Sequence, residues 1–470
     1  MLVAWKKVGS FFALVAALGV ARPVPAQDGL PAGLRIAIDK AVGEVLEKSG
    51  APSASIAVVQ GGAIAYEHAY GAATLEPKAP ATPAMRYSIG SISKQFTAAA
   101  ILMLVEEGKL SLDDGIARWL PDLTRASEVT VRQILSMTSG YQDFWPQDYV
   151  MPLMLEPVTP QAILDRWARK PLDFEPGTKR QYSNTNYVIA GLIVEKVSGM
   201  PLFEFLQKRV FAPLHMATVG DTDQAPLGPG EPTRYMRYGL GPLRIAPKEG
   251  KGWMYAAGEL AMTAHDLALW NISLMDRALM QPSSHRQMET EVVLKDGVGT
   301  GYGLGVSVAL SDGHRKISHG GEVSGFTAQN NTYPDDRAAV AVLTNLDATN
   351  ASDQIATKIA NLLFAETDRQ TDMALDRVRS IFEGLRHGRI DRSLFTANAN
   401  SYFTDQALKD FATSLAALGA WKEFTQASQS LRGGMTMRRY TVLFPKRTLR
   451  VTTFWMPDGQ LEQCMVAAAE

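Results

Sequence analysis

Hydrophobic positions in the N-terminal third of the chain follow first a helical and then a strand-like period. Apolar side chains recur every three to four residues where a helix is expected, and β-forming side chains cluster on both sides of the Gln60-Gly61-Gly62 turn. The turn residues favour a hairpin. The pattern predicts a helix over residues 34–48, strands over 54–59 and 63–70, and a helix over 91–104.

The middle of the chain changes to helical segments joined by loops, and strand patterns return only after about residue 300. A Pro- and Gly-rich stretch over 226–242 predicts a long loop, which we expect to form a functional rim or lid. The other predicted elements are helices starting near Thr130 and over 187–197, strands over 302–310, 316–319, 326–333 and 338–344, and a closing helix over 353–364.

This order of strands, helices and strands predicts one fold class. An α+β domain results if both ends of the segment build one antiparallel sheet flanked by helices, with a large helical insertion between them. A cleft is expected where the sheet and the insertion meet, because ligand pockets commonly form between such parts.

Beyond about residue 368 the chain becomes polar and then shows new helical and strand patterns. Helices are predicted over 373–385 and 405–418, and strands over 435–444, 448–455 and 460–466. About 100 residues suffice for a separate core, so we predict a small C-terminal α+β domain. The predicted domains are residues 27–367 and 368–470.

The first 26 residues have the pattern of a cleavable signal peptide. Lys6 and Lys7 precede an apolar stretch over 11–21, and small residues in Val24-Pro25-Ala26 suit signal peptidase. We expect cleavage after Ala26 and a periplasmic or secreted protein; an uncleaved anchor is the alternative. No later stretch approaches about 20 apolar residues, so no membrane span is expected after cleavage.

Composition narrows the choice of partners and cofactors. The 470 residues include 47 basic and 48 acidic ones, with a formal net charge of −1, so no nucleic acid partner is expected. The seven histidines lie singly, with no HExxH spacing, and we predict no metal and no cofactor. Cys464 is the only cysteine, which excludes an internal disulfide. The oligomeric state stays open.

The segment Ser91-Ile92-Ser93-Lys94 carries the first candidate chemistry. Residues three apart on a helix lie about 5–6 Å apart, so Lys94 can reach the hydroxyl of Ser91. A serine hydroxyl needs a neighbouring base to act as a nucleophile, and a buried lysine with a lowered pKa can be that base. An N-cap serine with an unrelated surface lysine is the alternative.

Two further motifs supply candidate polar groups. In Tyr182-Ser183-Asn184 the tyrosine can relay protons and Asn184 can bind a substrate amide, although a polar turn with a packed aromatic ring has the same pattern. In His319-Gly320-Gly321-Glu322 the two glycines follow a strand and permit close approach of a ligand, although a structural histidine is the alternative. The backbone N–H groups of Ser91 and Glu322 are candidate oxyanion donors.

These three motifs in this order resemble the signatures of the serine β-lactamase and penicillin-binding protein superfamily, Ser-x-x-Lys, Tyr-x-Asn and Lys/His-Thr/Gly-Gly. The chain is most similar to the class C β-lactamase-like branch, with its D-alanyl-D-alanine carboxypeptidases, D-aminopeptidases and family VIII esterases. Flanking matches that extend the resemblance over about residues 34–364 are Tyr87-Ser88-Ile89-Gly90, Gly108-Lys109-Leu110-Ser111-Leu112-Asp113-Asp114, Thr138-Ser139-Gly140-Tyr141, Ala257-Gly258 and Gly301-Tyr302-Gly303-Leu304-Gly305.

The resemblance implies specific roles. Ser91 forms an acyl-enzyme, and Lys94 and Tyr182 share the acid–base work. Asn184, His319, Gly320 and Gly321 bind substrate, and the backbone of Ser91 and Glu322 forms the oxyanion hole. The C-terminal segment loosely resembles a cystatin-like module.

The chain departs from efficient class C β-lactamases, which have Lys-Thr-Gly where it has His319-Gly320-Gly321. A histidine is mostly neutral at pH 7, so it grips a substrate carboxylate less firmly than lysine does. Met137 replaces a common histidine, and Glu259 stands where a second glycine is usual.

We therefore expect an exported serine hydrolase that acts on D-amino-acid peptides or on small esters and amides. A class C-type β-lactamase and a catalytically idle penicillin-binding sensor or scaffold are the alternatives. The expected partner is a peptide or another small-molecule substrate.

Overall fold

The computed structural model describes residues 29–147, 149–311 and 313–469. The predicted signal peptide lies outside these described residues. They divide into two compact units, one ending at Leu362 and the other running over Leu363–Glu470. Each unit has its own hydrophobic core.

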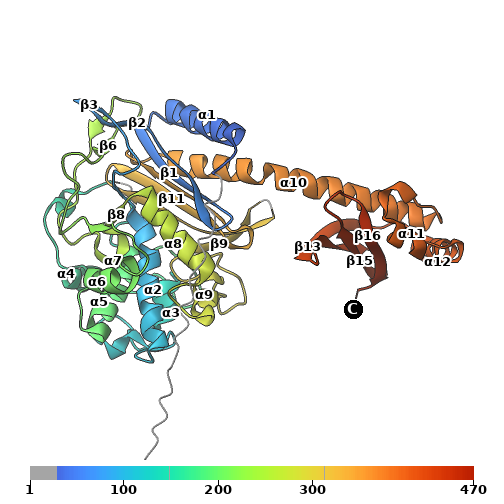
Figure 1. The fold of residues 1–470 in the computed structure, drawn as a ribbon. Coiled ribbons are helices and arrows are strands. Elements are labelled where there is room, and N and C mark those ends of the chain that lie inside the picture. The colour runs from blue at the N-terminus through green and yellow to red at the C-terminus, as the bar shows by residue number, and fades with distance from the viewer. Residues whose placement is uncertain (1–28, 148, 312, 470) are drawn as a thin grey trace, which may run out of the picture. The chain divides into compact units, whose positions relative to one another are not determined.

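A seven-stranded antiparallel sheet lies in the first unit between helix α1 (Ala32–Ser49) on one side and helix α8 (Ala264–Asp276) with the inserted helical block on the other (Figure 1). Its spatial order is β3-β2-β1-β12-β11-β10-β9, so strands from both ends of the unit meet where β1 pairs with β12. This confirms the predicted α+β class and the predicted sheet. The strands are β1 (Ser53–Gln60), β2 (Ala63–Leu75), β3 (Lys78–Pro80), β9 (Ser307–Ser311), β10 (His314–Val323), β11 (Phe326–Tyr333) and β12 (Ala338–Thr344).

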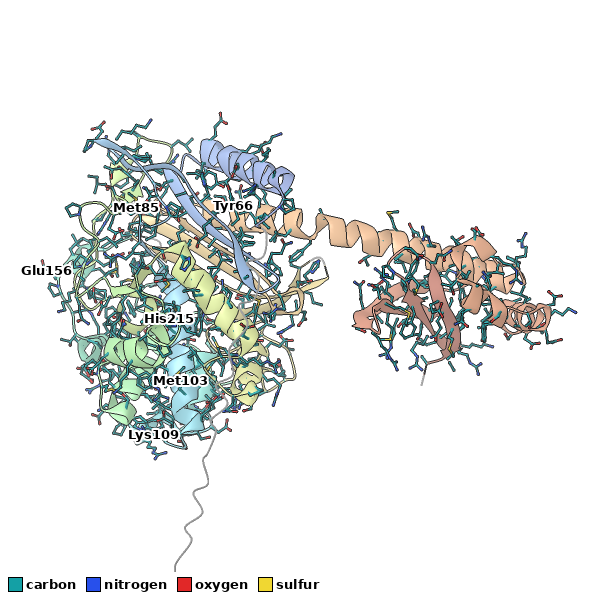
Figure 2. All side chains as sticks on the ribbon, viewed as in Figure 1. Tyr66, Met85, Met103, Lys109, Glu156 and His215 are labelled. Carbon is teal, nitrogen blue, oxygen red and sulfur yellow. The ribbon has the colours of Figure 1, made fainter. Side chains whose placement is uncertain are left out.

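Helices cover both faces of this sheet, and strands β1 and β12 are therefore buried along almost their whole length. Helix α8 packs on β1 and β12. Helix α1 packs on β1 and β2, where the hydroxyl of Tyr66, labelled in Figure 2, donates to Asp39 at 2.6 Å.

The inserted helical block packs beside the sheet and contributes most of the unit's core, including Met103 (Figure 2). Its central helix begins after a short 3-10 turn, η1 (Gly90–Ile92). The block contains α2 (Ser93–Glu106), α3 (Val131–Leu135), α4 (Pro160–Ile163), α5 (Asn184–Ser198), α6 (Leu202–Leu206), α7 (Tyr255–Gly258) and α9 (Pro282–Glu289). Two small ladders join it, one of β4 (Tyr87–Ser88), β8 (Leu260–Met262) and β5 (Gly220–Asp221), the other of β6 (Tyr235–Met236) and β7 (Arg244–Ile245).

The second unit contains a four-stranded antiparallel sheet, in the order β13-β14-β15-β16, with helices against it. This confirms the predicted C-terminal α+β domain. Strand β13 and helix α11 were not predicted. The elements are α11 (Ala397–Tyr402), α12 (Asp405–Ala416), β13 (Glu423–Arg432), β14 (Met435–Leu443), β15 (Thr448–Trp455) and β16 (Leu461–Ala468).

Several predicted boundaries were wrong. Strand β2 extends to Leu75 rather than to residue 70, and β10 covers His314–Val323 rather than 316–319. Helix α10 (Ala351–Arg386) is one element of 36 residues, where the sequence pattern predicted two helices separated by a polar stretch. That stretch is polar, but it contains no proline or glycine to break a helix. Strand β9 begins at Ser307 rather than at residue 302.

Among the described residues, no helix combines the length and the apolar character needed to cross a membrane.

Candidate active site

Ser91 lies in the short turn η1, directly before helix α2, and not in the first turn of the α-helix as predicted. Gly90 before it has a φ of +52°, and a Cβ there would lie 2.8 Å from the backbone nitrogen of Glu322. Only glycine fits this backbone conformation and this contact. The turn therefore holds Ser91 tightly against strand β10.

The amine of Lys94 lies inside the protein with three partners. It is 0 % exposed, and Nζ lies 2.8 Å from the Oγ of Ser91. It also lies 2.8 Å from Oδ1 of Asn184 and 2.9 Å from the carbonyl oxygen of Ala257. The structure thus brings together the Ser–Lys pair that the motif predicts.

The protonation state of Lys94 that suits catalysis is the neutral amine. Burial lowers the pKa of Lys94 to about 7, against the opposing effect of the nearby Asp143 carboxylate. A neutral amine has two hydrogens and one lone pair. The two acceptor oxygens, of Asn184 and Ala257, take the hydrogens, and the lone pair is left to face the Ser91 hydroxyl.

Asp143, which was not among the predicted site residues, orients the side chain of Asn184. Its Oδ1 accepts from the backbone N–H of Asn184 at 2.9 Å and from its side-chain amide at 3.2 Å, which turns the amide oxygen toward Lys94. Both ends of the Asn184 amide therefore bind protein groups. Its predicted contact with substrate stays a prediction. Asp143 lies two residues after the Thr138-Ser139-Gly140-Tyr141 match, and this proximity is the sequence signal that could have identified it as a site residue.

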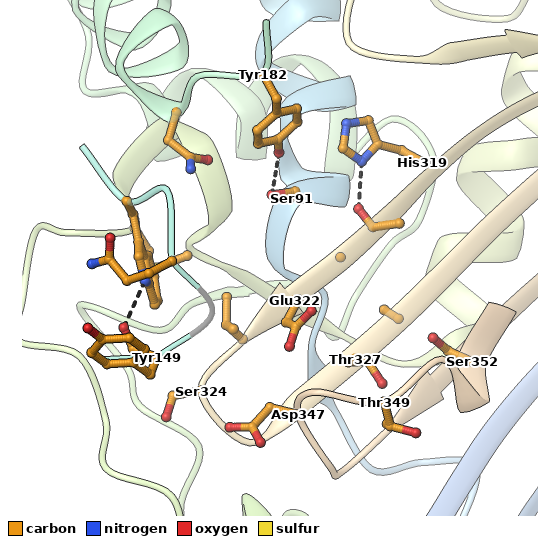
Figure 3. Close-up of a pocket in the computed structure, with 18 of the residues that line it drawn as sticks. Ser91, Tyr149, Tyr182, His319, Glu322, Ser324, Thr327, Asp347, Thr349 and Ser352 are labelled. Atoms are coloured by element: carbon orange, nitrogen blue, oxygen red, sulfur yellow. Dashed lines mark hydrogen bonds between the residues drawn. The ribbon is translucent and has the colours of Figure 1, made fainter. Parts of the chain in front are cut away.

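The hydroxyl of Tyr182 donates to the Oγ of Ser91 at 2.7 Å (Figure 3). The residue is 36 % exposed, but its hydroxyl end points into the cleft. Desolvation there, and then the neighbouring Tyr302, raise the pKa of Tyr182. Tyr182 is therefore a neutral phenol near pH 7 and can give a proton rather than take one.

His319 is a neutral side chain held between two partners. Its Nδ1 lies 2.5 Å from the carbonyl oxygen of Gly320, so Nδ1 carries the hydrogen, and Nε2, at 3.0 Å, accepts from the hydroxyl of Tyr302. Burial, reinforced by the charge of Lys94, lowers the pKa of His319 to about 4. The imidazole thus offers no positive charge at neutral pH.

The two glycines of strand β10 have different surroundings. A Cβ at Gly321 would lie 1.9 Å from the carbonyl oxygen of Ile89, so glycine is needed there for the close approach of the protein backbone. Gly321 also lines the cleft, and its predicted contact with substrate stays a prediction. At Gly320 the nearest atom would be Oε1 of Gln329, at 3.2 Å. Ser91 and Glu322 line the same cleft, which keeps their backbone N–H groups as candidate oxyanion donors.

The cleft has a volume of about 610 Å³, and its charged lining is acidic (Figure 3). None of its described lining residues is lysine or arginine. None belongs to the loop over 226–242, which was expected to form a rim. Residues of the segments 145–147, 149–150 and 347–353 line the cleft instead. The acidic lining residues are Asp143, Glu322, Asp347 and Asp353.

Known proteins are similar to this chain in sequence and in fold. The family profile described as Beta-lactamase matches residues 38–363. A D-aminopeptidase of Brucella anthropi is 29 % identical over 338 residues, which are 70 % of this chain and 62 % of the relative. The chain thus spans less than two thirds of that relative's length.

Two further comparisons cover similar ground. A penicillin-binding protein of Bacillus subtilis is 26 % identical over 367 residues, 74 % of this chain and 78 % of the relative. The crystal structure of a D-stereospecific amidohydrolase from Streptomyces sp. matches with a TM-score of 0.60 and 26 % identity, over 68 % of this chain and 96 % of that one.

Proposed function

Since the chain belongs to the beta-lactamase family, we propose that it is an exported serine hydrolase that cleaves D-amino-acid peptides, or small esters and amides, through an acyl-enzyme on Ser91. The observation that carries this proposal is the position of Lys94. Its buried amine has two acceptor oxygens for its hydrogens, and Ser91 lies in front of its lone pair.

In the first step the neutral amine of Lys94 takes the hydroxyl proton of Ser91. The Oγ then forms a bond to the carbonyl carbon of the substrate, and the carbonyl π electrons move to its oxygen. The backbone N–H groups of Ser91 and Glu322 stabilise that oxyanion. The pKa of Lys94 near 7 means that a useful fraction of the amine is neutral at physiological pH.

In the second step the bond to the leaving group breaks. The phenol of Tyr182 gives its proton to the departing nitrogen or oxygen, and the ammonium of Lys94, whose Nζ lies 5.0 Å from the centroid of the Tyr182 ring, returns a proton to the phenolate. Water then attacks the acyl carbon and gives one proton to the neutral amine of Lys94. The bond between that carbon and the Oγ of Ser91 breaks, Lys94 returns the proton to Oγ, and the carboxylic acid product departs.

The charges of the cleft favour one class of substrate. β-Lactams and D-alanyl-D-alanine ends carry a carboxylate, for which a cationic side chain is the usual partner. The described lining offers acidic groups and a neutral His319 instead. This supports substrates that carry a free amino group or no charge, and the D-aminopeptidase and D-stereospecific amidohydrolase relatives support the same class.

The two alternatives receive less support. The acidic cleft disfavours a β-lactamase, because the substrate carboxylate would meet like charges. A penicillin-binding sensor or scaffold that does not turn over substrate would not need the complete Lys94–Ser91–Tyr182 hydrogen-bonded chain, so the presence of this chain counts against that alternative.

One panel of substrates tests the proposal. The purified chain and its Ser91→Ala variant are incubated with D-alanine amide, L-alanine amide, a p-nitrophenyl ester, nitrocefin and a fluorescent penicillin. We expect turnover of the D-amide or the ester that is lost in the variant. Rapid hydrolysis of nitrocefin would support the β-lactamase, and stable penicillin labelling with no turnover would support the sensor.

Export is tested separately, since it rests on the pattern of residues 1–26 alone. We expect the mature chain in the periplasmic or secreted fraction, with Gln27 at its N-terminus by mass spectrometry. A chain that keeps Met1 in the membrane fraction would contradict cleavage.

A further inference from the structure

A second cavity of about 640 Å³ lies in the first unit and is lined by residues that the proposed chemistry does not use. It gathers Asp221, Asp223 and Glu259, of which one carboxylate oxygen each lies within 4.8 Å of the others. The short ladder between β5 and β8 creates this cluster, because Asp221 pairs with Leu260, the neighbour of Glu259.

Glu259 is the unusual member of this cluster. It is 4 % exposed and lines the cavity, yet no described residue donates a hydrogen bond to its carboxylate. A buried carboxylate without donors is costly, and buried polar groups normally have partners. Its ionised form also faces Asp221, Asp223 and Glu195, all of the same charge.

The two aspartates are held in place by the protein around them. Oδ1 of Asp221 accepts from the backbone N–H of Asp223 at 2.8 Å, and its Oδ2 accepts from the Gln224 amide at 2.6 Å. Oδ2 of Asp223 accepts from the backbone N–H of Gly252 at 2.7 Å. The aspartates are thus oriented in advance, while the carboxylate of Glu259 lacks a partner of opposite charge.

Nearby lysines do not supply that partner. The Nζ of Lys248 donates to the carbonyl oxygen of Thr222 at 2.6 Å, and Lys251 lines the cavity. Within the part of the chain that the structure describes, neither lysine forms an ion pair with Asp221, Asp223 or Glu259.

We propose that Asp221, Asp223 and Glu259 bind a hard divalent cation of the calcium class. Carboxylate oxygens are the ligands that such ions prefer, and the cluster contains no sulfur or imidazole that would favour a softer metal. Calcium–oxygen distances of about 2.3–2.6 Å allow two ligands of one ion to lie up to about 5 Å apart. The oxygen spacing fits that limit, and the cavity leaves room for water as the remaining ligands.

Hydrogen bonds of the residues next to Glu259 connect this carboxylate cluster to the active site. Glu259 directly follows helix α7, whose Ala257 carbonyl accepts from Lys94. The next residue, Leu260, donates from its N–H to Ser93 at 3.2 Å and accepts from the N–H of Ile89 at 3.0 Å. A bound ion would therefore fix the segment that supports Lys94 and the turn of Ser91.

Binding is measured on the full mature chain after removal of metals with EDTA. Calcium chloride is added, heat is followed by titration calorimetry, and the unfolding temperature is recorded with and without the ion. We expect one calcium ion per chain and a rise of several degrees in the unfolding temperature. Magnesium chloride, as a second arm, should give a smaller rise, since magnesium demands shorter and more regular coordination.

Variants assign the ion to this cavity. Glu259→Gln should lose the calcium response. In EDTA it should unfold at or above the temperature of the unaltered chain, because it replaces a carboxyl group whose ionised form is disfavoured by burial and by the neighbouring carboxylates. Asp223→Asn repeats the test should Glu259→Gln fail to fold. Asp353→Asn, an acidic residue of the other cavity, is the matched control and should keep the response.

Two results would overturn the proposal: no calcium binding to the unaltered chain, or an equal response in Glu259→Gln and Asp353→Asn. Neither depends on the substrate, so this test can fail while the proposed hydrolase activity stands.

Discussion

At the scale of single residues, we expect the amine of Lys94 to set the pH range of the proposed hydrolase activity. Burial lowers its pKa from 10.5 to about 7, so the amine is protonated below that pH and neutral above it. We expect kcat/KM for a p-nitrophenyl ester to rise about tenfold per pH unit below pH 7 and to level off above it. His319, with a pKa of about 4, lies too low to produce this limb.

The control for this assignment is Asp143→Asn. The carboxylate of Asp143 raises the pKa of Lys94, so its removal should move the limb to lower pH and reduce kcat by misorienting Asn184. A profile without a limb near pH 7, or a limb that moves to higher pH in this variant, would contradict the role of Lys94 as the base.

In the proposed mechanism Tyr182 acts in the step that releases the leaving group. Tyr182→Phe removes the proton that the leaving group needs, so turnover of an amide should fall by about 10²–10⁴-fold. An ester with a p-nitrophenolate leaving group needs no such proton and should lose much less. Equal losses with both substrates, measured as kcat/KM, would show that Tyr182 acts elsewhere.

At the scale of elements, the contact between strand β10 and turn η1 fixes the distance from the predicted oxyanion donor to the nucleophile. Gly321→Ala places a methyl group 1.9 Å from the carbonyl oxygen of Ile89, and this should destabilise the first unit by about 1–3 kcal/mol and reduce turnover. Denaturant unfolding of the purified variant measures the loss.

The neighbouring glycine provides the comparison. A methyl group at Gly320 would lie 3.2 Å from the end of the Gln329 side chain and 3.9 Å from the carbonyl oxygen of Ala328, which is an ordinary contact distance. Gly320→Ala should therefore unfold at nearly the same denaturant concentration as the unaltered chain. Equal destabilisation by both substitutions would mean that backbone strain, and not the contact with Ile89, limits this strand.

At the scale of the whole molecule, the two units have separate cores and should unfold separately. Phe382 is 1 % exposed in the core of the second unit. Phe382→Ala should lower the stability of that unit by about 3–5 kcal/mol. We expect calorimetry to show two transitions, of which the substitution moves only one, with kcat/KM unchanged. A single transition that moves as a whole would show that the units are coupled.

Elements with a clear local signal could be predicted from the sequence. Strands β11 and β12 have the predicted bounds, because alternating and apolar runs end at turn residues. Helix α10 was divided wrongly, because hydropathy changes along it while nothing in the chain interrupts its hydrogen bonds. Strand β13 was missed because its residues are mostly polar.

The sequence by itself determined the Ser91–Lys94 pair, since a spacing of three residues on helical turns brings two side chains together wherever the helix lies. It also determined that both ends of the first unit build one sheet. Only the tertiary structure decided that Asp143 orients Asn184, that the cleft has an acidic lining, and that Glu259 is buried beside Asp221 and Asp223. Burial and charge at those places depend on residues distant along the chain, whose proximity no local pattern encodes.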